Sequence, residues 1–97
     1  MEIETIKKKI KSVMIGENVN FTDESDKFEV MEFLSEKIKT NIEEAEKELF
    51  ILSNGKCNNL DTFYSNQKEF QPTSLNFAKL LLQNNLLIKN LIELNKL

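Results

Sequence analysis

The side chains that could carry chemistry in this sequence are carboxylates, lysines and one thiol, because histidine is absent. Two acidic runs, "DESD" at 23–26 and "EEAEKE" at 43–48, place carboxylates close together. Catalysis near neutral pH usually relies on histidine, and both runs have the composition of solvated helix faces. Glu43 and Lys47 stand at the i,i+4 spacing of an ordinary stabilising ion pair. We therefore expect no catalytic residues and no enzymatic activity.

The single cysteine, Cys57, follows Lys56 and precedes a predicted helix. That position would make a thiol more reactive, whereas the alternative is a small, partly buried loop residue. One thiol cannot form an internal disulfide, and one cysteine without histidine cannot build a zinc site. The sequence also lacks a glycine-rich phosphate loop. We expect no metal, no cofactor and no small-molecule substrate.

The charge pattern bears on which partners the chain could bind. All thirteen basic residues are lysine and the net charge is −3, whereas specific contacts to nucleic acids mostly use the planar fork of arginine. We therefore expect no nucleic-acid partner. Residues 16–55 carry eleven acidic side chains and four lysines. The lysine-rich segment 7–11 is predicted to dock on the acidic helix that follows it, in preference to a membrane surface.

The elements that would position these residues are helices, since two glycines and one proline are too few for a many-turned β-fold. Apolar residues at helical spacing predict a first helix that ends with Gly16 as its C-cap. A second, long helix would begin at Thr22 or Asp23 as the N-cap and stop at 54–55, "NG". The third would be capped by Asn58 or Asn59, and "QP" at 71–72 separates it from a fourth that starts near 72–74.

The long second helix has a narrow apolar stripe. From Ile38 to Leu52 its apolar residues are spaced four, three, four and three apart, as in the seam of a coiled coil. Phe33 and Ile51 lie off this stripe on the back of the helix, where we expect contacts with a partner. The sequence thus predicts an all-α fold: one domain over 1–97, a small bundle of three to four helices with a long central helix and coiled-coil-like packing.

The last helix is the most apolar part of the chain. On a helical wheel, its apolar residues fall within an arc of about 160°, which calls for two or more neighbouring helices. These residues are Phe77, Leu80, Leu81, Leu87, Ile88, Leu91, Ile92 and Leu94. Leu82 and Leu86 fall on the far side, where a lone bundle would leave them in water, and we assign them to partner binding.

Asn84 falls inside the apolar arc of the same helix. An asparagine on an apolar seam can fix register and oligomeric state, and on that basis we include it among the partner-binding candidates. The alternative is a helix rotated slightly from the wheel, with Asn84 hydrated at the boundary. Polar residues interrupt 75–97 too often for a membrane-spanning helix. The N-terminus lacks the apolar stretch of a signal peptide, so we expect a cytoplasmic protein.

These observations favour a non-enzymatic helical protein–protein interaction module, a small subunit or adaptor of a larger assembly. An apolar last helix ending in "LIELNKL" resembles the inner-rod subunits of bacterial type III secretion systems, which implies such a subunit. Those proteins carry small residues and a basic pair where this chain has "QNNLLIKN". The helix count resembles bacteriocin immunity proteins, whose diagnostic motifs are absent here. The alternative function is a small acidic inhibitor, immunity or chaperone-type protein that blocks a partner.

Overall fold

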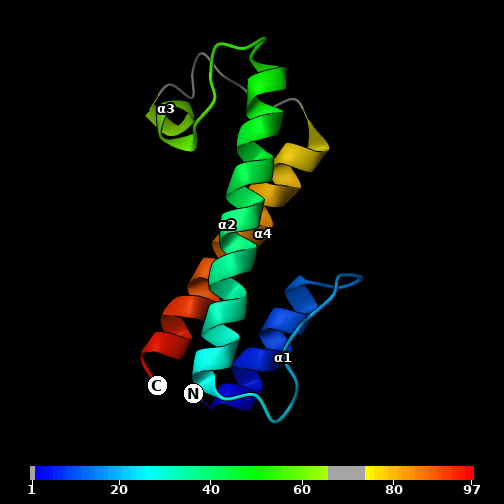
Figure 1. The fold of residues 1–97 in the computed structure, drawn as a ribbon, viewed down its shortest axis with the longest axis vertical. Helices are drawn as coiled ribbons and strands as arrows, with labels where there is room; N and C mark the ends of the chain where they lie inside the picture. The colour runs from blue at the N-terminus through cyan, green and yellow to red at the C-terminus, as the bar shows by residue number, and fades with distance from the viewer. Residues whose placement is uncertain (1, 66–73) are drawn as a thin grey trace.

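Helix α2, Lys27–Leu52, forms the long axis of the molecule and runs antiparallel to α4, Leu75–Asn95 (Figure 1). The computed structural model describes residues 2–65 and 74–97, which contain four helices and no strand. Helix α1, Ile3–Val13, lies at the end where the chain termini meet, and the short α3, Leu60–Ser65, lies at the other end (Figure 1). The predicted all-α bundle with a long central helix is confirmed. The heptad packing of its seam stays a prediction.

The ends of α2 follow from local hydrogen bonding and backbone geometry. Asp26 is the N-cap, since its carboxylate accepts a hydrogen bond from the Glu29 backbone N–H at 2.9 Å. The prediction of Thr22 or Asp23 as the cap is therefore wrong, because both lie in the turn before the helix. The predicted stop at 54–55 is confirmed: Asn54 and Gly55 have φ values of 56° and 81°, which end helical geometry.

Side-chain caps also begin α3 and α4. Asn59 accepts a hydrogen bond from the Thr62 backbone N–H at 2.8 Å, and Ser74 accepts one from the Phe77 backbone N–H at 3.2 Å. The cap of α3 agrees with the predicted choice of Asn58 or Asn59, and α4 begins at Leu75, just after the predicted start near 72–74. Helix α1 has its C-cap at Met14 instead of Gly16, which adopts a φ of 83° two residues later. The predicted break at 71–72 lies outside the described residues.

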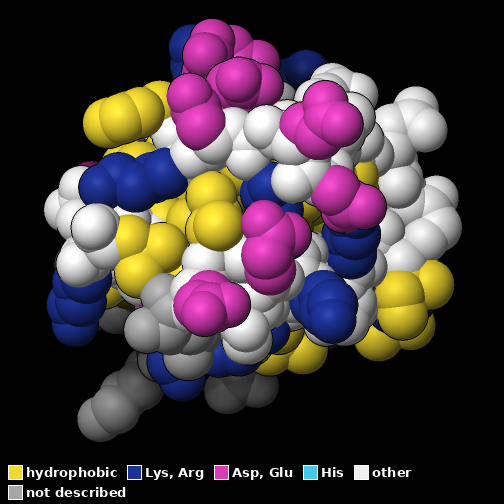
Figure 2. Space-filling view, turned by 90° about the horizontal axis from the view of Figure 1, so that it is seen from below, with side chains coloured by type: hydrophobic (Ala, Val, Ile, Leu, Met, Phe, Trp, Pro, Cys, Tyr) yellow, Lys and Arg dark blue, Asp and Glu magenta, His cyan; other side chains and the backbone are white. Residues whose placement is uncertain are grey.

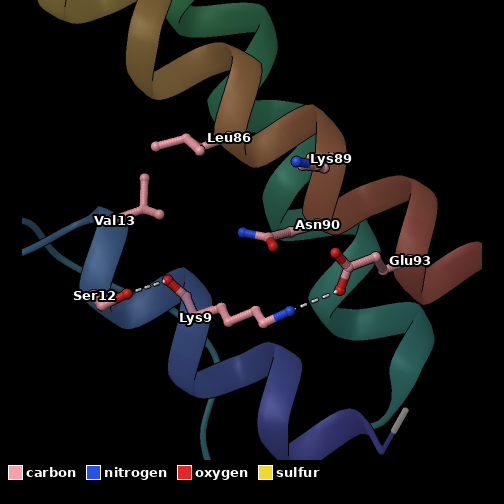
Figure 3. A pocket seen from close by; sticks show the side chains of 7 residues that line it. All are labelled: Lys9, Ser12, Val13, Leu86, Lys89, Asn90 and Glu93. Atoms are coloured by element: carbon pink, nitrogen blue, oxygen red, sulfur yellow. Dashed lines mark hydrogen bonds and ion pairs between the residues drawn. The ribbon is translucent and has the colours of Figure 1, made fainter.

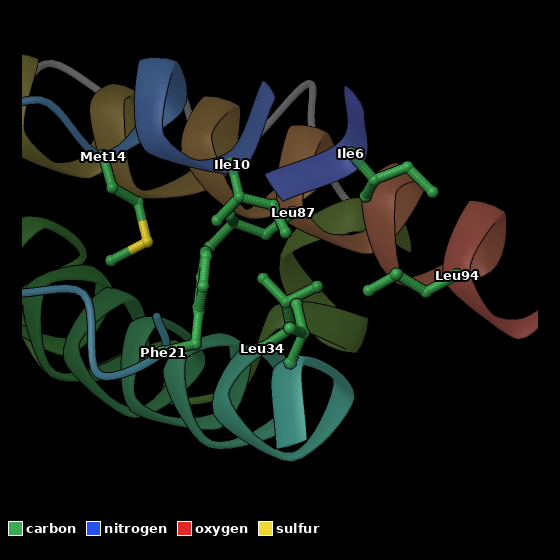
Figure 4. Close-up of a cluster of buried hydrophobic side chains, with 8 residues drawn as sticks. Ile6, Ile10, Met14, Phe21, Leu34, Leu87 and Leu94 are labelled. Atoms are coloured by element: carbon green, nitrogen blue, oxygen red, sulfur yellow. The ribbon is translucent and has the colours of Figure 1, made fainter. Parts of the chain in front are cut away.

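A first hydrophobic cluster joins α1, α2, α4 and the loop after α1 (Figure 4). Its buried members are Ile6, Ile10, Met14, Phe21, Val30, Leu34, Leu87 and Leu94. The Phe21 ring contacts the Phe33 ring edge-on, with centroids 5.5 Å apart. Phe33 is thus half-buried against its own chain, and its assignment to partner binding stays a prediction.

A second hydrophobic cluster lies at the α3 end. It consists of Ala45, Leu49, Cys57, Phe63 and Phe77, with partly buried leucines around it. The Phe63 and Phe77 rings meet edge-on at 5.2 Å, which fastens α3 to the start of α4. Cys57 is buried in this cluster, and its thiol donates a hydrogen bond to the Asn59 carbonyl at 3.5 Å. The structure thus places the thiol in the core.

Polar side chains occupy the α2–α4 contact. The Asn41 amide donates hydrogen bonds to Gln83 Oε1 at 2.9 Å and to Asn84 Oδ1 at 3.3 Å. Asn84 donates in turn towards the Ile38 carbonyl at 3.5 Å and is only 6% exposed. Asn84 is therefore buried inside the chain, so the alternative that placed it at a hydrated boundary is wrong. The predicted stripe on α2 also omitted Asn41, which is fully buried.

The docking of α1 differs from the prediction. Helix α1 packs mainly along α4 instead of along the acidic α2. Its Lys9 pairs with Glu93 of α4, at 3.4 Å between Nζ and Oε2. Lys7 is buried, and its Nζ donates a hydrogen bond to the Asp23 backbone carbonyl at 3.0 Å. The acidic segment thus binds α1 through the loop before α2.

The loop between α1 and α2 is also tied to the other helices. Lys37 Nζ of α2 lies 2.7 Å from Glu17 Oε1, and the Gln83 amide of α4 donates a hydrogen bond to the same carboxylate. The hydrogen bond from Lys37 is the main reason that the pKa of Glu17 is lowered from its ordinary value of 4.5. Among the helices described, none has a stretch apolar and long enough to cross a bilayer.

Candidate protein-binding surface

The outward side of α4 carries a row of exposed leucines. Leu75, Leu82 and Leu86 are spaced seven and four residues apart, so they lie along one side of the helix, and we call them the α4 row. Leu82 is 64% exposed and Leu86 is 41% exposed. Another side of α4 packs against α1 and α2, and among the described residues Leu75 and Leu82 stay largely exposed, while Leu86 borders Val13 of α1.

A groove between α1 and α4 continues the row at its lower end (Figure 3). The groove has a volume of about 240 Å³, and Leu86 and Val13 form its apolar end. Lys9 and Glu93 lie at the other end, where their ion pair bridges the two helices (Figure 3). The groove therefore combines an apolar wall with charged groups, as many protein-binding surfaces do.

Lysine side chains flank the α4 row. Lys79 and Lys89 are both exposed, and neither forms an ion pair within the part of the chain that the structure describes. The acidic residue within α4 is Glu93, which is already paired with Lys9. The row and its borders thus form an apolar surface with a positive edge.

A second exposed apolar surface lies at the α3 end of α2. Phe50 and Ile51 line a shallow groove of about 720 Å³, together with Glu43, Glu46, Lys47 and Asn58. We call this the α2 groove. Ile51 is 69% exposed, and these residues lie on the side of α2 opposite its buried face. The α2 groove and the α4 row therefore point away from each other.

The end of the molecule that holds both chain termini has a mixed surface. Figure 2 shows lysine and acidic side chains interleaved there, with hydrophobic side chains between them and at the edges. Lys11 of α1 lies 3.4 Å from the Asp23 carboxylate. On the face that Figure 2 shows, lysine side chains do not gather into one continuous patch.

The predicted partner-binding residues divide into three groups. Leu82 and Leu86 lie together on the α4 row, and Ile51 lies apart from them in the α2 groove. Phe33 and Asn84 point into the chain's own packing, where they contact Phe21 and Asn41.

Sequence reasoning missed Leu75, Phe50 and the exposure of Ile88 and Ile92. Leu75 could have been found, because it occupies the same position on the helix as Leu82, seven residues earlier. Ile88 and Ile92 belong to the predicted apolar arc, but α1 and α2 cover only part of that arc.

No three cysteine, aspartate and glutamate side chains of the described residues are placed so that they could hold a metal ion. Comparison of the chain with protein families, with characterised proteins and with solved structures gives no match.

Proposed function

We propose that this chain is a non-enzymatic helical protein–protein interaction module, a small subunit or adaptor of a larger assembly, and that it binds through the α4 row. The observation that supports the proposal is the exposure of Leu82 and Leu86 beside Leu75, on a helix whose other side is already packed. Removal of apolar surface from water contributes roughly 25 cal/mol per Å², so a contiguous row supplies a driving force for binding.

The first experiment is the molar mass of the purified chain in solution, by light scattering across a concentration series. We expect the mass to rise above 11.3 kDa as concentration increases. The variant Leu82→Lys/Leu86→Lys should stay at the monomer mass, because the row loses the apolar surface whose burial would drive association. Both leucines are exposed, so the fold should persist, which far-UV circular dichroism checks.

A matched control separates the row from apolar exposure in general. Ile15 and Phe28 are 82% and 72% exposed and lie outside α4. The variant Ile15→Lys/Phe28→Lys adds the same charge and should associate as the unmodified chain does. An unmodified chain that stays monomeric at every concentration would contradict the assembly proposal. Equal loss of association in both variants would show that the row has no special role.

A second candidate function is a small inhibitor that blocks a basic partner. The observation that favours it is the row of exposed glutamates on the outer side of α2, at positions 29, 32, 36 and 43. An acidic helix face can engage a basic cleft and accelerate association. A chain that is monomeric at all concentrations, with or without the leucine changes, would favour this function over the first.

A further inference from the structure

We propose that the α4 row of one copy docks into the α2 groove of a second copy, so that the chain assembles head to tail. This inference rests on the proposed function and adds the partner and the geometry. Both surfaces have apolar centres, because the row is a line of exposed leucines on a helix and the shallow groove is lined by Phe50 and Ile51.

The two surfaces also match in charge. Lys79 and Lys89 flank the row, whereas Glu43 and Glu46 line the groove. Lys47 lies among these glutamates, but the acidic groups outnumber it. Residues 16–55, which include the groove's α2 residues, hold most of the acidic side chains of the chain. Opposite charges around two apolar centres favour contact between the row and the groove.

Charge disfavours the symmetric alternative, in which the row of one copy contacts the row of another. A two-fold pairing centred between Leu82 and Leu86 would place Lys79 of each copy opposite Lys89 of the other, since both lie three residues outside the leucine pair. Like charges that face each other oppose association.

The fold determines what such contacts would build. The buried faces of α2 and α4 pack against each other, so the row and the groove lie on opposite sides of the molecule. A chain cannot fill its own groove, and each added copy presents a new free row or groove. A heterologous contact of this kind yields a ring if its rotation closes and an open fibre if it does not.

Two variants, each blocked on one surface, test the arrangement. Leu82→Lys/Leu86→Lys removes the row and leaves the groove, whereas Phe50→Lys/Ile51→Lys removes the groove and leaves the row. We expect each variant to stay at 11.3 kDa by light scattering when it is alone. An equimolar mixture should double that mass and stop there, because only one intact row and one intact groove remain per pair.

The outcomes separate this inference from the proposed function. If the mixture stays monomeric although the unmodified chain associates and the row variant does not, the contact is not head to tail and only this inference fails. Continued association of the groove variant alone would have the same meaning. An unmodified chain that never associates would contradict both. Ile15→Lys/Phe28→Lys serves again as the matched control and should associate alone, without a partner variant.

Discussion

The Asn41 amide donates a hydrogen bond to Asn84 Oδ1 across the α2–α4 contact, at 3.3 Å. Asn41 also bonds to Gln83, while its own Oδ1 is buried without a hydrogen-bond donor among the described residues. Displacement of either helix by one turn would leave these amides buried and unpaired, which is costly. The pair therefore favours one register of α2 against α4, the role that the sequence suggested for Asn84 between helices of different chains.

We expect Asn84→Leu to lower the free energy of unfolding by about 1–2 kcal/mol, since Asn41 loses a partner in a buried place. The double variant Asn41→Leu/Asn84→Leu should recover most of this loss, because no buried amide then lacks its partner. Urea denaturation at pH 7 measures both. Asn85→Ala, at an exposed neighbouring position, should change stability by less than about 0.5 kcal/mol. If the loss of stability in the double variant equalled the sum of the losses in Asn41→Leu and Asn84→Leu, the two side chains would not be energetically coupled.

Glu17 should make stability depend on pH in the acid range. Its folded-state pKa is lowered below 4.5, mainly by the hydrogen bond from Lys37. A lowered pKa contributes stability that is present above the unfolded-state pKa and is lost as pH falls through the folded-state value. Because the pair is partly exposed, the contribution should stay below about 1 kcal/mol.

The measurement for Glu17 is the difference in urea midpoint between the unmodified chain and Glu17→Gln, at pH 7 and at pH 3. The unmodified chain should be more stable at pH 7, and the difference should shrink at pH 3. Lys37→Met removes the main cause of the pKa shift and should abolish the same pH dependence. If the stability difference between the unmodified chain and Glu17→Gln grew on acidification, the pKa of Glu17 would not be lowered in the folded state.

Lys7 should stabilise the fold although it carries a charge. Its side chain is 2% exposed, and its Nζ bonds to the Asp23 carbonyl and lies 3.9 Å from Glu4 Oε1. Lys7→Met keeps the apolar stem but removes the donor, so we expect a loss of about 1–2 kcal/mol in urea denaturation. Lys8→Met changes an exposed lysine one position along and should have little effect. Equal effects of the two changes would contradict this account.

Phe77 should be the residue that most stabilises the α3 end. It is fully buried and contacts Phe63 edge-on. Phe77→Ala should cost about 3–5 kcal/mol, a large part of the stability of a small domain, and Phe77→Leu should cost less. Leu75→Ala removes a similar apolar side chain from the surface two residues earlier and serves as the control. Thermal and urea unfolding provide the comparison.

Helical periodicity was enough to predict the elements and much of what α4 exposes. Leu82 and Leu86 are exposed and Leu87 is buried, as their angles on the helix predict. The same method failed for polar residues in the interior. Asn90 is a polar residue of α4, yet it is buried beside α1. A prediction from helical periodicity assumes that polar side chains face water. Whether a buried polar side chain finds a hydrogen-bond partner depends on residues far away in the sequence.

The candidate surfaces were predictable only in part, for a similar reason. The exposure of a leucine on one helix follows from its own sequence, but a groove needs two elements. Val13 and Leu86 come from opposite ends of the chain and meet only because α1 packs along α4. The N-cap of α2 shows the same limit on a smaller scale, because Thr22, Asp23 and Asp26 are all suitable cap residues and local loop geometry selects Asp26.

The contact between Asn41 and Asn84 also separates the two hydrophobic clusters, one holding Phe21 and Leu34 and the other Phe63 and Phe77. Cooperativity between the two ends of the molecule must therefore pass through α2 and α4 themselves. The short α3 and the loop before it can open while the three-helix end stays closed. Backbone amides in α3 should then exchange with solvent by local opening, and those of α2 beside α1 only by global unfolding.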